Sequence, residues 1–389
     1  MSDSIVRDAS PLLKKISKQF RAIAIVGPRQ SGKTTLAKQI FPKKPYLSFE
    51  TPSTRNFFES DPNGFLHQYR NGAIFDEAQR VPELFSYLQG VIDESDKRGR
   101  FILTGSNNFA LQENITQTLA GRIAYIDLLP FSINEIQSQK KSPYKNGAHS
   151  FIVRGGYPEV ATKNVSTQNW FASYIRTYVE RDVRQLKSID NLAKFEKLLL
   201  LCAGRTGQLL NMSNLSIEVG VKMDTIQSWL GVLQSSFIIH LLKPYHVNFN
   251  KRVVKTPKLY FYDTGLACAL LGIHSENDLR FHHMRGALFE NMVINELLKN
   301  RFNKGKRSNL FFWRDNTGNE LDVIIDNGKQ MIPVEIKSGA TVTDEFFRGI
   351  NFWQKISGNK NGIIVYGGND SQQRSNNVTV MSWKTVDDL

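Results

Sequence analysis

Gly27-Pro28-Arg29-Gln30-Ser31-Gly32-Lys33-Thr34 is the stretch that decides the fold of the first part of this chain. It matches the pattern GxxxxGK[ST], in which backbone N–H groups of a glycine-rich loop surround a polyphosphate. The apolar run over 22–26 predicts a buried strand before the loop, and residues 34–40 predict a helix start after it. A strand–loop–helix unit of this kind places the phosphates at a helix N-terminus.

The loop residues 27–34 and the adjoining Thr35 are therefore predicted to bind ATP. Lys33 would supply a cation at the β- and γ-phosphates, and Thr34 a hydroxyl ligand for Mg²⁺. The alternative is a glycine-rich turn that matches the pattern by chance.

Two acids end the next predicted strand, over 72–77. Asp76 is predicted to hold Mg²⁺, directly or through water. Glu77 is predicted to orient and deprotonate the attacking water. Because these acids follow the loop by about forty residues, as a second phosphate-site element does, the pair predicts catalysis more strongly than two acids alone.

A third predicted strand, over 100–107, ends in small polar residues. The carboxyl ends of parallel strands meet at one crevice, so Thr104, Ser106 or Asn107 is expected at the γ-phosphate or the water. An ordinary strand-to-loop turn is the alternative for each of them.

Arg122 follows Gly121 at a predicted helix end. Phosphoryl transfer needs a cation that stabilises charge in the transition state, and a neighbouring subunit often supplies it. Arg122 is the candidate for that role, and a surface arginine without one is the alternative.

This first part resembles the AAA-type ATPases, in a bacterial and archaeal branch fused to a C-terminal domain of unknown function. The resemblance rests on motifs spread over the predicted domain 1–165: Gly27–Thr34, Phe75-Asp76-Glu77-Ala78-Gln79, Leu103-Thr104-Gly105-Ser106, Gly121-Arg122, Leu129-Pro130-Phe131-Ser132 and Gly155-Gly156-Tyr157-Pro158-Glu159. It implies an ATPase that forms a homo-oligomer, for which a hexameric ring is one candidate form and a monomer is the alternative. A second-sensor arginine is not recognisable at the family's standard position, which leaves the coupling of hydrolysis to motion open.

A helical connector over 166–190 and a winged-helix module over 191–280 are predicted next. Residues 214–221 have the pattern of a helix entering a turn, and 222–230 open a second helix. Strands over 237–242 and 258–262 flank a basic segment, predicted to be the wing, that contains Lys251, Arg252 and Lys255. Such a module binds duplex DNA through the second helix and the wing, or serves only as a protein–protein module.

Residues 281–389 carry a second set of acids. Asp322 lies on one predicted strand, and Glu335 and Lys337 lie two apart on the next, after the hairpin turn Asn327-Gly328. Pairing of these strands is expected to bring the three side chains together. Glu290 interrupts the apolar stripe of a helix predicted over 285–301, so it needs a partner there, and a metal ion or Lys337 is expected to supply it.

This order of elements resembles the restriction-endonuclease-like PD-(D/E)xK fold. The resemblance implies that Asp322 and Glu335 hold Mg²⁺, that Lys337 positions or activates water, and that Glu290 is an additional acid. Residues 320 and 321 are Glu and Leu, where the motif has Pro before the aspartate, which leaves catalytic activity open.

A formal net charge of +14 over 389 residues predicts a polyanionic partner, most often nucleic acid, and here DNA. Cys202 and Cys268 lie in apolar stretches without a CxxC pair, so neither a zinc site nor a disulfide framework is expected. No segment has the ~18 consecutive apolar residues of a membrane span, and the N-terminus lacks an apolar signal core. We therefore expect a cytoplasmic protein with no membrane partner.

Together these features predict an α/β protein: a parallel-sheet ATPase domain, a winged helix and a small α/β nuclease-like domain. The leading functional hypothesis is a Mg²⁺-dependent ATPase that acts on DNA and whose C-terminal domain binds or cuts nucleic acid. The alternatives are a nucleotide-dependent switch or scaffold with a protein partner, and a DNA motor whose nuclease-like domain is inactive.

Overall fold

The computed structural model describes residues 5–106, 119–139, 142–144, 147–163, 165–178, 189, 191–245, 254–328 and 330–389. The chain forms two compact units, each composed of several segments. The first contains Met1–Phe131, Ser235–Phe237 and Lys299–Arg307, and the second contains Ser132–Gln234, Ile238–Leu298 and Ser308–Leu389. The division into four parts at residues 165, 190 and 280 stays a prediction.

The first unit is built on a five-stranded sheet in which all neighbouring strands are parallel, in the order β2-β3-β4-β1-β5. Its strands are β1 (Ala22–Val26), β2 (Tyr46–Ser48), β3 (Ile74–Asp76), β4 (Phe101–Gly105) and β5 (Ile123–Asp127). This confirms the α/β class and the parallel sheet predicted for this part of the chain. Because the strands are parallel, the segments that follow β1, β3 and β4 all start at the same edge of the sheet.

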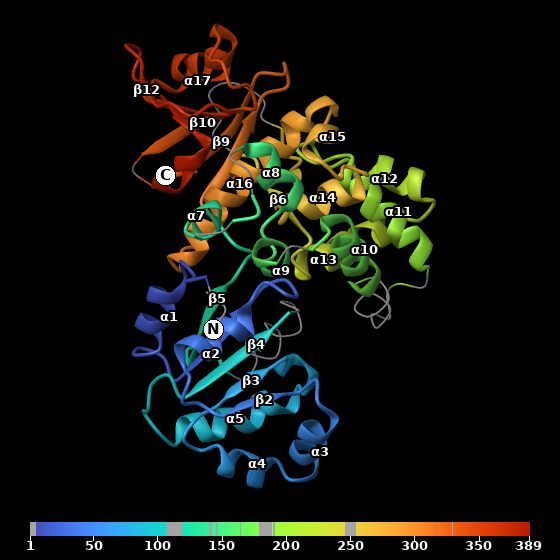
Figure 1. The fold of residues 1–389 in the computed structure, drawn as a ribbon, viewed down its shortest axis with the longest axis vertical. Helices are drawn as coiled ribbons and strands as arrows, with labels where there is room; N and C mark the ends of the chain where they lie inside the picture. The colour runs from blue at the N-terminus through green and yellow to red at the C-terminus, as the bar shows by residue number, and fades with distance from the viewer. Residues whose placement is uncertain are drawn as a thin grey trace. The chain divides into compact units, whose positions relative to one another are not determined.

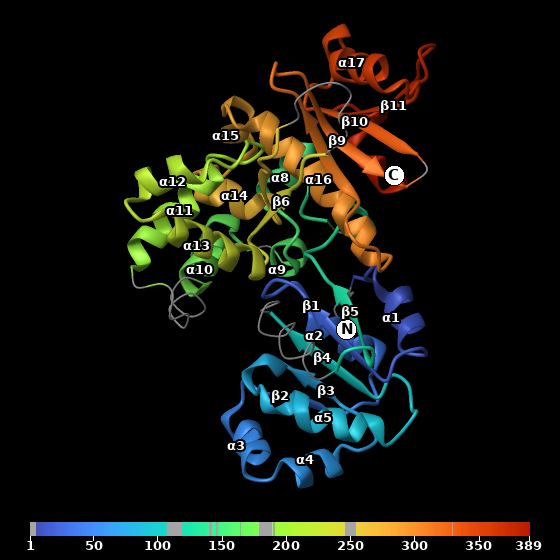
Figure 2. The ribbon, with the colours of Figure 1, turned by 180° about the vertical axis from the view of Figure 1, so that it is seen from behind.

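Helices cover this sheet, and two of them share one apolar core with it. The helical segments are α1 (Ser10–Ile16), α2 (Lys33–Ile40), α3 (Pro52–Ser60), α4 (Pro62–Gln68), η1 (Ala78–Arg80) and α5 (Glu83–Asp93). Leu13 of α1 and Leu36 of α2 pack with the strand residues Ile23, Ile25 and Ile102. Helices α3, α4 and α5 gather on the β2–β3 side of the sheet (Figure 1). The view from behind shows the same grouping (Figure 2).

The second unit begins with helices and one short hairpin. The helices are α7 (Ile133–Gln137), α8 (Ala148–Arg154), α9 (Pro158–Thr162), α10 (Thr167–Thr177), α11 (Leu192–Ala203), α12 (Met212–Val219), α13 (Met223–Ser235), α14 (Thr264–Leu270) and α15 (Glu276–Phe281). Strands β6 (Ile239–Leu242) and β7 (Lys258–Phe261) pair antiparallel. Of the helical connector predicted over 166–190, α10 is the described helix, and residues 179–188 and 190 lie outside the described residues.

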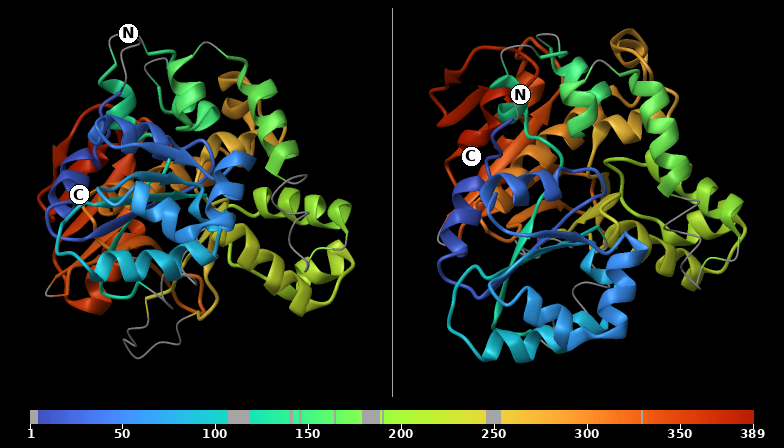
Figure 3. Two further views of the ribbon diagram at one scale, coloured as in Figure 1. Left: turned by 90° about the horizontal axis from the view of Figure 1, so that it is seen from below. Right: turned by 60° about the horizontal axis from the view of Figure 1, so that its bottom comes forward.

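Helices α11, α12 and α13 form one cluster, seen from two directions in Figure 3. Gly220 ends α12 with φ of 75°, a left-handed conformation that lets the chain turn sharply into α13. Lys194 of α11 donates to the Gly220 carbonyl at 2.6 Å and so holds this turn. The two helices and their turn match the predicted helix-turn-helix pattern, while the winged-helix assignment stays a prediction. Lys251 and Arg252 of the predicted wing lie outside the described residues.

The C-terminal part of the second unit is a six-stranded mixed sheet in the order β12-β13-β11-β10-β9-β8. Its elements are α16 (Arg285–Asn303), β8 (Leu310–Arg314), β9 (Glu320–Asp326), β10 (Met331–Lys337), η3 (Asp344–Phe347), α17 (Arg348–Ser357), β11 (Gly362–Tyr366), β12 (Gln372–Gln373), β13 (Val378–Ser382) and η4 (Trp383–Asp388). Strand β10 pairs antiparallel with β9 and parallel with β11, and α17 connects β10 to β11. The hairpin predicted at Asn327-Gly328 is present between β9 and β10. The nuclease-like assignment stays a prediction.

Among the described residues, no helix combines the length and the apolar character that a membrane span requires.

Candidate functional site

The phosphate loop depends on a close approach between Gly27 and the chain that leaves β5. The carbonyl oxygen of Leu128 lies where a side-chain carbon on residue 27 would stand. The Leu128 N–H donates to Val26 O at 2.7 Å and fixes the two segments together. Gly27 also has φ of 155°, so any larger residue there has to displace the loop or the end of β5.

Lys33, the first residue of α2, is buried inside the loop that precedes it. Its Nζ donates to the carbonyl oxygens of Gly27 at 3.0 Å and Pro28 at 2.7 Å. Burial lowers the pKa of Lys33 to about 8, although the carboxylates of Glu77 and Asp76 oppose that shift. Two neutral loop carbonyls contact this ammonium, and the nearby carboxylates do not offset the effect of its burial on the pKa. The ammonium is therefore suited to bind an anion such as a phosphate group.

A buried hydroxyl without a partner marks the centre of the loop. Ser31 is fully buried, and its Oγ makes no hydrogen bond with any described residue. Behind it, the buried guanidinium of Arg7 donates to Ser31 O at 2.8 Å and to Leu129 O at 2.7 Å. Arg7 thus ties the loop to the segment after β5, a contact that the sequence analysis did not identify. The unsatisfied Ser31 hydroxyl fits a phosphate oxygen as its missing partner.

The remaining loop residues form its outer turn. Arg29 is partly buried and lies near enough to Lys33 to lower its pKa further. Gln30 is exposed with φ of 60°, and Gly32 is the N-cap residue of α2, a helix that no side chain caps. Thr35 is exposed in the first turn of that helix. The first turn therefore leaves its backbone N–H groups for a ligand.

Asp76 ends β3 and collects three hydroxyl donors. Its Oδ1 accepts hydrogen bonds from Thr34 Oγ1 at 2.6 Å and from the Thr104 hydroxyl, and its Oδ2 accepts one from the Tyr46 hydroxyl at 2.9 Å. Burial, followed by the hydrogen bond to Asp76, raises the pKa of Tyr46 to about 12, so Tyr46 stays a donor at neutral pH. Thr34 and Asp76 are in contact, as two ligands of one Mg²⁺ ion would be.

Tyr46, which opens the three-residue strand β2, is a site residue that the sequence does not predict. No local pattern distinguishes this tyrosine, because only the pairing of β2 with β3 brings its hydroxyl to Asp76.

Glu77 is held in a conformation that non-glycine residues rarely adopt. It has φ of 54° and ψ of 43°, a left-handed conformation that costs about 1–3 kcal/mol. Its Oε2 accepts hydrogen bonds from Ser106 Oγ at 3.1 Å and from Gln79 Nε2 at 2.5 Å. Ser106 therefore contacts the predicted catalytic acid. Asn107, the other candidate after β4, lies outside the described residues.

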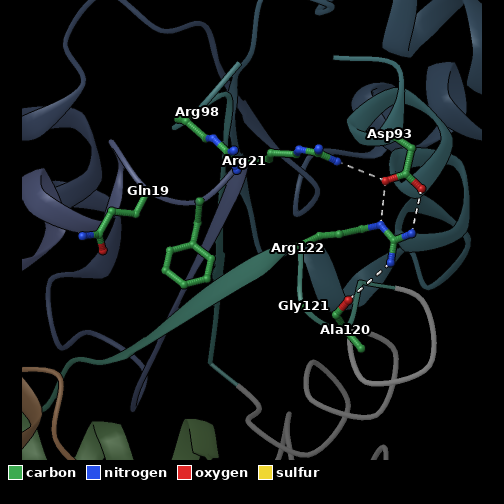
Figure 4. Close-up of a pocket in the computed structure, with 8 residues that line it drawn as sticks. Gln19, Arg21, Asp93, Arg98, Ala120, Gly121 and Arg122 are labelled. Carbon is green, nitrogen blue, oxygen red and sulfur yellow. Dashed lines mark hydrogen bonds and ion pairs between the residues drawn. The ribbon is translucent and has the colours of Figure 1, made fainter. Parts of the chain in front are cut away.

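Arg122 lies at the opposite edge of the sheet from these residues. It directly precedes β5, which runs parallel to β1, whereas the phosphate loop follows the far end of β1. Its guanidinium donates to both oxygens of Asp93, from Nε at 2.6 Å and from Nη2 at 2.9 Å (Figure 4). The hydrogen bonds from Arg122 hold the pKa of Asp93 below its usual range. The structure does not bring Arg122 to the nucleotide residues of its own chain.

The surroundings of Arg122 form a basic cavity of about 350 Å³, whose lining residues are Gln19, Phe20, Arg21, Asp93, Arg98, Ala120, Gly121 and Arg122. Arg21 reaches the same Asp93 carboxylate at 3.4 Å. Three guanidinium groups therefore line this cavity beside one carboxylate.

In the second unit, β9 and β10 bring the predicted triad together. The Ile336 N–H donates to Asp322 Oδ2 at 2.8 Å, and Lys337 Nζ lies 2.6 Å from Glu335 Oε1. Glu335 is 6% exposed, and its Oε2 makes no hydrogen bond with any described residue. Gly349 of α17 leaves the room for that oxygen, because a side-chain carbon there would stand 2.5 Å from Oε2. Asp322, Glu335 and Lys337 thus form one cluster.

Glu290, the predicted fourth acid, is held by two residues of β7. Its Oε1 lies 3.1 Å from Lys258 Nζ and accepts a hydrogen bond from the Tyr260 hydroxyl at 2.5 Å. Lys258 also forms an ion pair with Oε1 of Glu320. The other oxygen of Glu320, Oε2, lies 3.0 Å from Arg314 Nη1. Lys258 and Tyr260 are site residues that the sequence does not predict, because the residues of β7 indicate only a strand that flanks the wing. Their alternation along the strand is the signal that places both on one face.

Burial and the neighbouring charges shift the pKa values of these acids and of Lys258. Burial, followed by the charge of Asp322, raises the pKa of Glu335 to about 8. Burial also raises the pKa of Glu290, which Lys258 opposes. Burial alone would lower the pKa of Lys258, but the surrounding charges, Glu290 first, raise it well above its ordinary value. No group of three or more His, Cys, Asp or Glu that could hold a metal ion occurs in the described part of the chain.

Three family models match separate stretches of the chain. Residues 19–137 match the "AAA domain", residues 146–277 match the "Domain of unknown function (DUF8612)", and residues 285–386 match the "Domain of unknown function (DUF4143)". The chain therefore joins an AAA-type P-loop ATPase domain to a C-terminal domain of unknown function. This confirms the predicted AAA-type ATPase domain joined to a C-terminal domain of unknown function.

Two relatives are similar over most of their length. The uncharacterized protein Rv2008c of Mycobacterium tuberculosis is 29% identical over 338 residues, which are 86% of this chain and 74% of that protein. An uncharacterized protein of Haemophilus influenzae is 25% identical over 305 residues, 71% of this chain and 74% of that protein. Among solved structures, a signal transduction ATPase from Pyrococcus horikoshii is 12% identical with a TM-score of 0.27, over 77% of this chain and 48% of that one.

Proposed function

We propose that this protein is a Mg²⁺-dependent ATPase that works on DNA. The single observation that supports the ATPase most is the set of partners at one edge of the first sheet. Lys33, Thr34, Asp76 and Glu77 are joined there by hydrogen bonds to the loop, to each other or to neighbouring hydroxyls, beside the unsatisfied hydroxyl of Ser31. The match to an AAA domain over residues 19–137 supports the same function.

In this proposal bound Mg-ATP supplies the γ-phosphoryl group that passes to water. Lys33 exchanges its loop carbonyls for phosphate oxygens, and Ser31 donates its hydroxyl. Thr34 and Asp76 hold the metal ion, and the other hydroxyls on Asp76 keep its carboxylate oriented. Glu77 accepts the proton of the attacking water through its carboxylate, which Ser106 and Gln79 hold in place.

Arg122 is proposed to act on the nucleotide of a second copy. It cannot stabilise the γ-phosphate of its own chain, because it lies at the opposite edge of the sheet. A role in phosphoryl transfer therefore requires an assembly of identical chains, in which Arg122 leaves Asp93 for the neighbouring phosphate. The resemblance to ring-forming ATPases supports such an assembly.

DNA is the proposed polyanionic partner, on the strength of the +14 charge and the helix-turn-helix pair α12–α13. We propose that the C-terminal domain binds nucleic acid and does not cut it. Lys258 favours this role over metal-dependent cleavage, because it pairs with the acids Glu290 and Glu320.

A mixing experiment tests the site and the assembly together. Lys33→Ala is expected to abolish ATP binding and turnover, because it removes the cation of the loop. Arg122→Ala is expected to keep ATP binding but lose about 10³-fold in turnover, the size of effect that such arginines have. Mixing the two inactive proteins creates interfaces in which an intact loop meets an intact Arg122, so part of the turnover should return.

Arg98→Ala, which lines the same cavity, serves as the matched control and is expected to hydrolyse ATP at the normal rate. Full turnover by Lys33→Ala would overturn the ATPase assignment. Inactive mixtures, or an active Arg122→Ala protein, would overturn only the action of Arg122 on a second copy.

A further inference from the structure

An ammonium group lies in the interior of the C-terminal acidic cluster, which we define as Glu290, Glu320, Asp322 and Glu335. Lys258 has a side chain only 3% exposed, and its Nζ contacts Glu290 at 3.1 Å and forms an ion pair with Glu320. A lysine is rarely buried to this extent unless it is paired. The question is therefore which cation neutralises this cluster.

The position of Lys258 is fixed by the backbone of its strand. Asn291 of α16 bonds both backbone groups of Phe261: its Oδ1 accepts from the N–H at 3.0 Å and its Nδ2 donates to the carbonyl at 2.8 Å. Asn295, one turn further along α16, donates to the same carbonyl at 2.9 Å. These amides fix β7 against α16, so the face that carries Lys258 and Tyr260 is directed at Glu290.

Most of the carboxylate oxygens that a metal ion would need already have partners, although the buried Glu335 Oε2 has none among the described residues. Glu290 Oε1 accepts from Lys258 and Tyr260, and Asp322 Oδ2 accepts a backbone N–H. Glu335 Oε1 pairs with Lys337, and the two oxygens of Glu320 pair with Lys258 and with an arginine. Mg²⁺ requires oxygen ligands at about 2.0–2.1 Å in near-octahedral geometry. The residues present do not fit that requirement while Lys258 occupies the cluster.

We infer that Lys258 is the resident cation of the acidic cluster and that it takes the place of a divalent metal ion there. An ammonium and a divalent cation a few ångströms apart in a buried site repel each other, so the charge of Lys258 opposes metal binding by the carboxylates that it contacts. The cluster then ties β7 to α16 and β9 instead of cleaving phosphodiesters. This inference does not depend on the ATPase proposal.

The test is a count of bound Mn²⁺ by electron paramagnetic resonance on the full chain without nucleotide. All proteins carry Asp76→Asn, so that the phosphate loop does not contribute. The background protein and its Asp322→Asn variant are expected to bind equal amounts of Mn²⁺. A Mn²⁺ ion that the background protein binds and Asp322→Asn removes would overturn the inference.

Removing the ammonium should open the cluster to a metal ion. Lys258→Met is expected to gain one Mn²⁺ per chain, because the carboxylates it leaves unpaired are costly to bury. Adding Glu335→Gln to Lys258→Met should remove that ion, whereas Lys258→Arg should gain none because it keeps the charge.

Lys258→Gln keeps hydrogen-bond donors at this position and replaces Lys258→Met if the latter does not fold. A folded Lys258→Met or Lys258→Gln protein that gains no Mn²⁺ would show that something other than Lys258 excludes the metal.

Discussion

The protonation of a single amine, that of Lys33, is expected to make the phosphate loop sensitive to pH. Burial lowers its pKa to about 8, against 10.5 for an unburied lysine. Between these two values the unfolded chain binds a proton that the folded chain lacks, so the stability of the fold rises with pH over this window. Below pH 8 the folded loop carries the full cost of a buried charge. Bound phosphates would remove that cost by supplying the counter-charge.

We therefore predict that binding of a non-hydrolysable ATP analogue at pH 8 takes up about half a proton per chain, because half of the Lys33 amines are neutral before binding. The uptake should fall towards zero near pH 6.5, where Lys33 is already protonated. Calorimetry in two buffers with different protonation enthalpies measures it. The control is Lys33→Arg, whose guanidinium keeps its charge and should add no proton. Equal uptake by both proteins would contradict the prediction.

At the scale of elements, the decisive feature is how β5 and the phosphate loop meet. The loop residue Gly27 accommodates the carbonyl of Leu128, and Arg7 joins both segments from behind. Strand β5 is therefore part of the loop's support, although it lies about a hundred residues further along the chain.

Gly27→Ala is expected to lower stability by about 1–3 kcal/mol and to weaken ATP binding, because the new methyl group overlaps the Leu128 carbonyl. Thermal unfolding and nucleotide titration measure the two effects. Gly90→Ala in α5 is the matched control: a side chain there meets no atom within 4 Å, and alanine favours a helix by about 1 kcal/mol. If Gly27→Ala has the same unfolding temperature and the same affinity for ATP as the parent protein, this prediction is wrong.

At the scale of the whole molecule, the +14 charge is the property that favours the proposed polyanionic partner. Lysine and arginine side chains that neutralise DNA phosphates release counterions, so the affinity should fall steeply as salt rises. The effect of each DNA form on turnover identifies which form the protein binds.

We predict that steady-state ATP hydrolysis at low salt rises when duplex, branched or single-stranded DNA is added, and that the stimulation disappears as salt increases. Comparing the three forms identifies the preferred DNA structure. An equally sized polyanion such as heparin controls for charge alone and should stimulate less. Turnover that no DNA form changes would favour the nucleotide-dependent switch or scaffold with a protein partner.

Much of the ATPase half was predictable because its chemistry lies in short contiguous segments. The loop Gly27–Thr34 and the pair Asp76-Glu77 each follow an apolar run, and a parallel sheet brings such segments to one edge whatever the loops between them. In the second unit, the same reasoning anticipated the approach of Asp322 to Glu335 across the β9–β10 hairpin.

By itself, the sequence predicted the phosphate loop, the two acids after the next apolar run and the pairing of β9 with β10 across a local hairpin, because each depends on neighbours in the chain. Only the tertiary structure decided that Lys258 lies between Glu290 and Glu320, and that Asp93 holds Arg122. Those charges are far apart in sequence and leave no periodic pattern. Their pairing follows from how a helix, a strand and a sheet edge pack, which is a property of the folded chain.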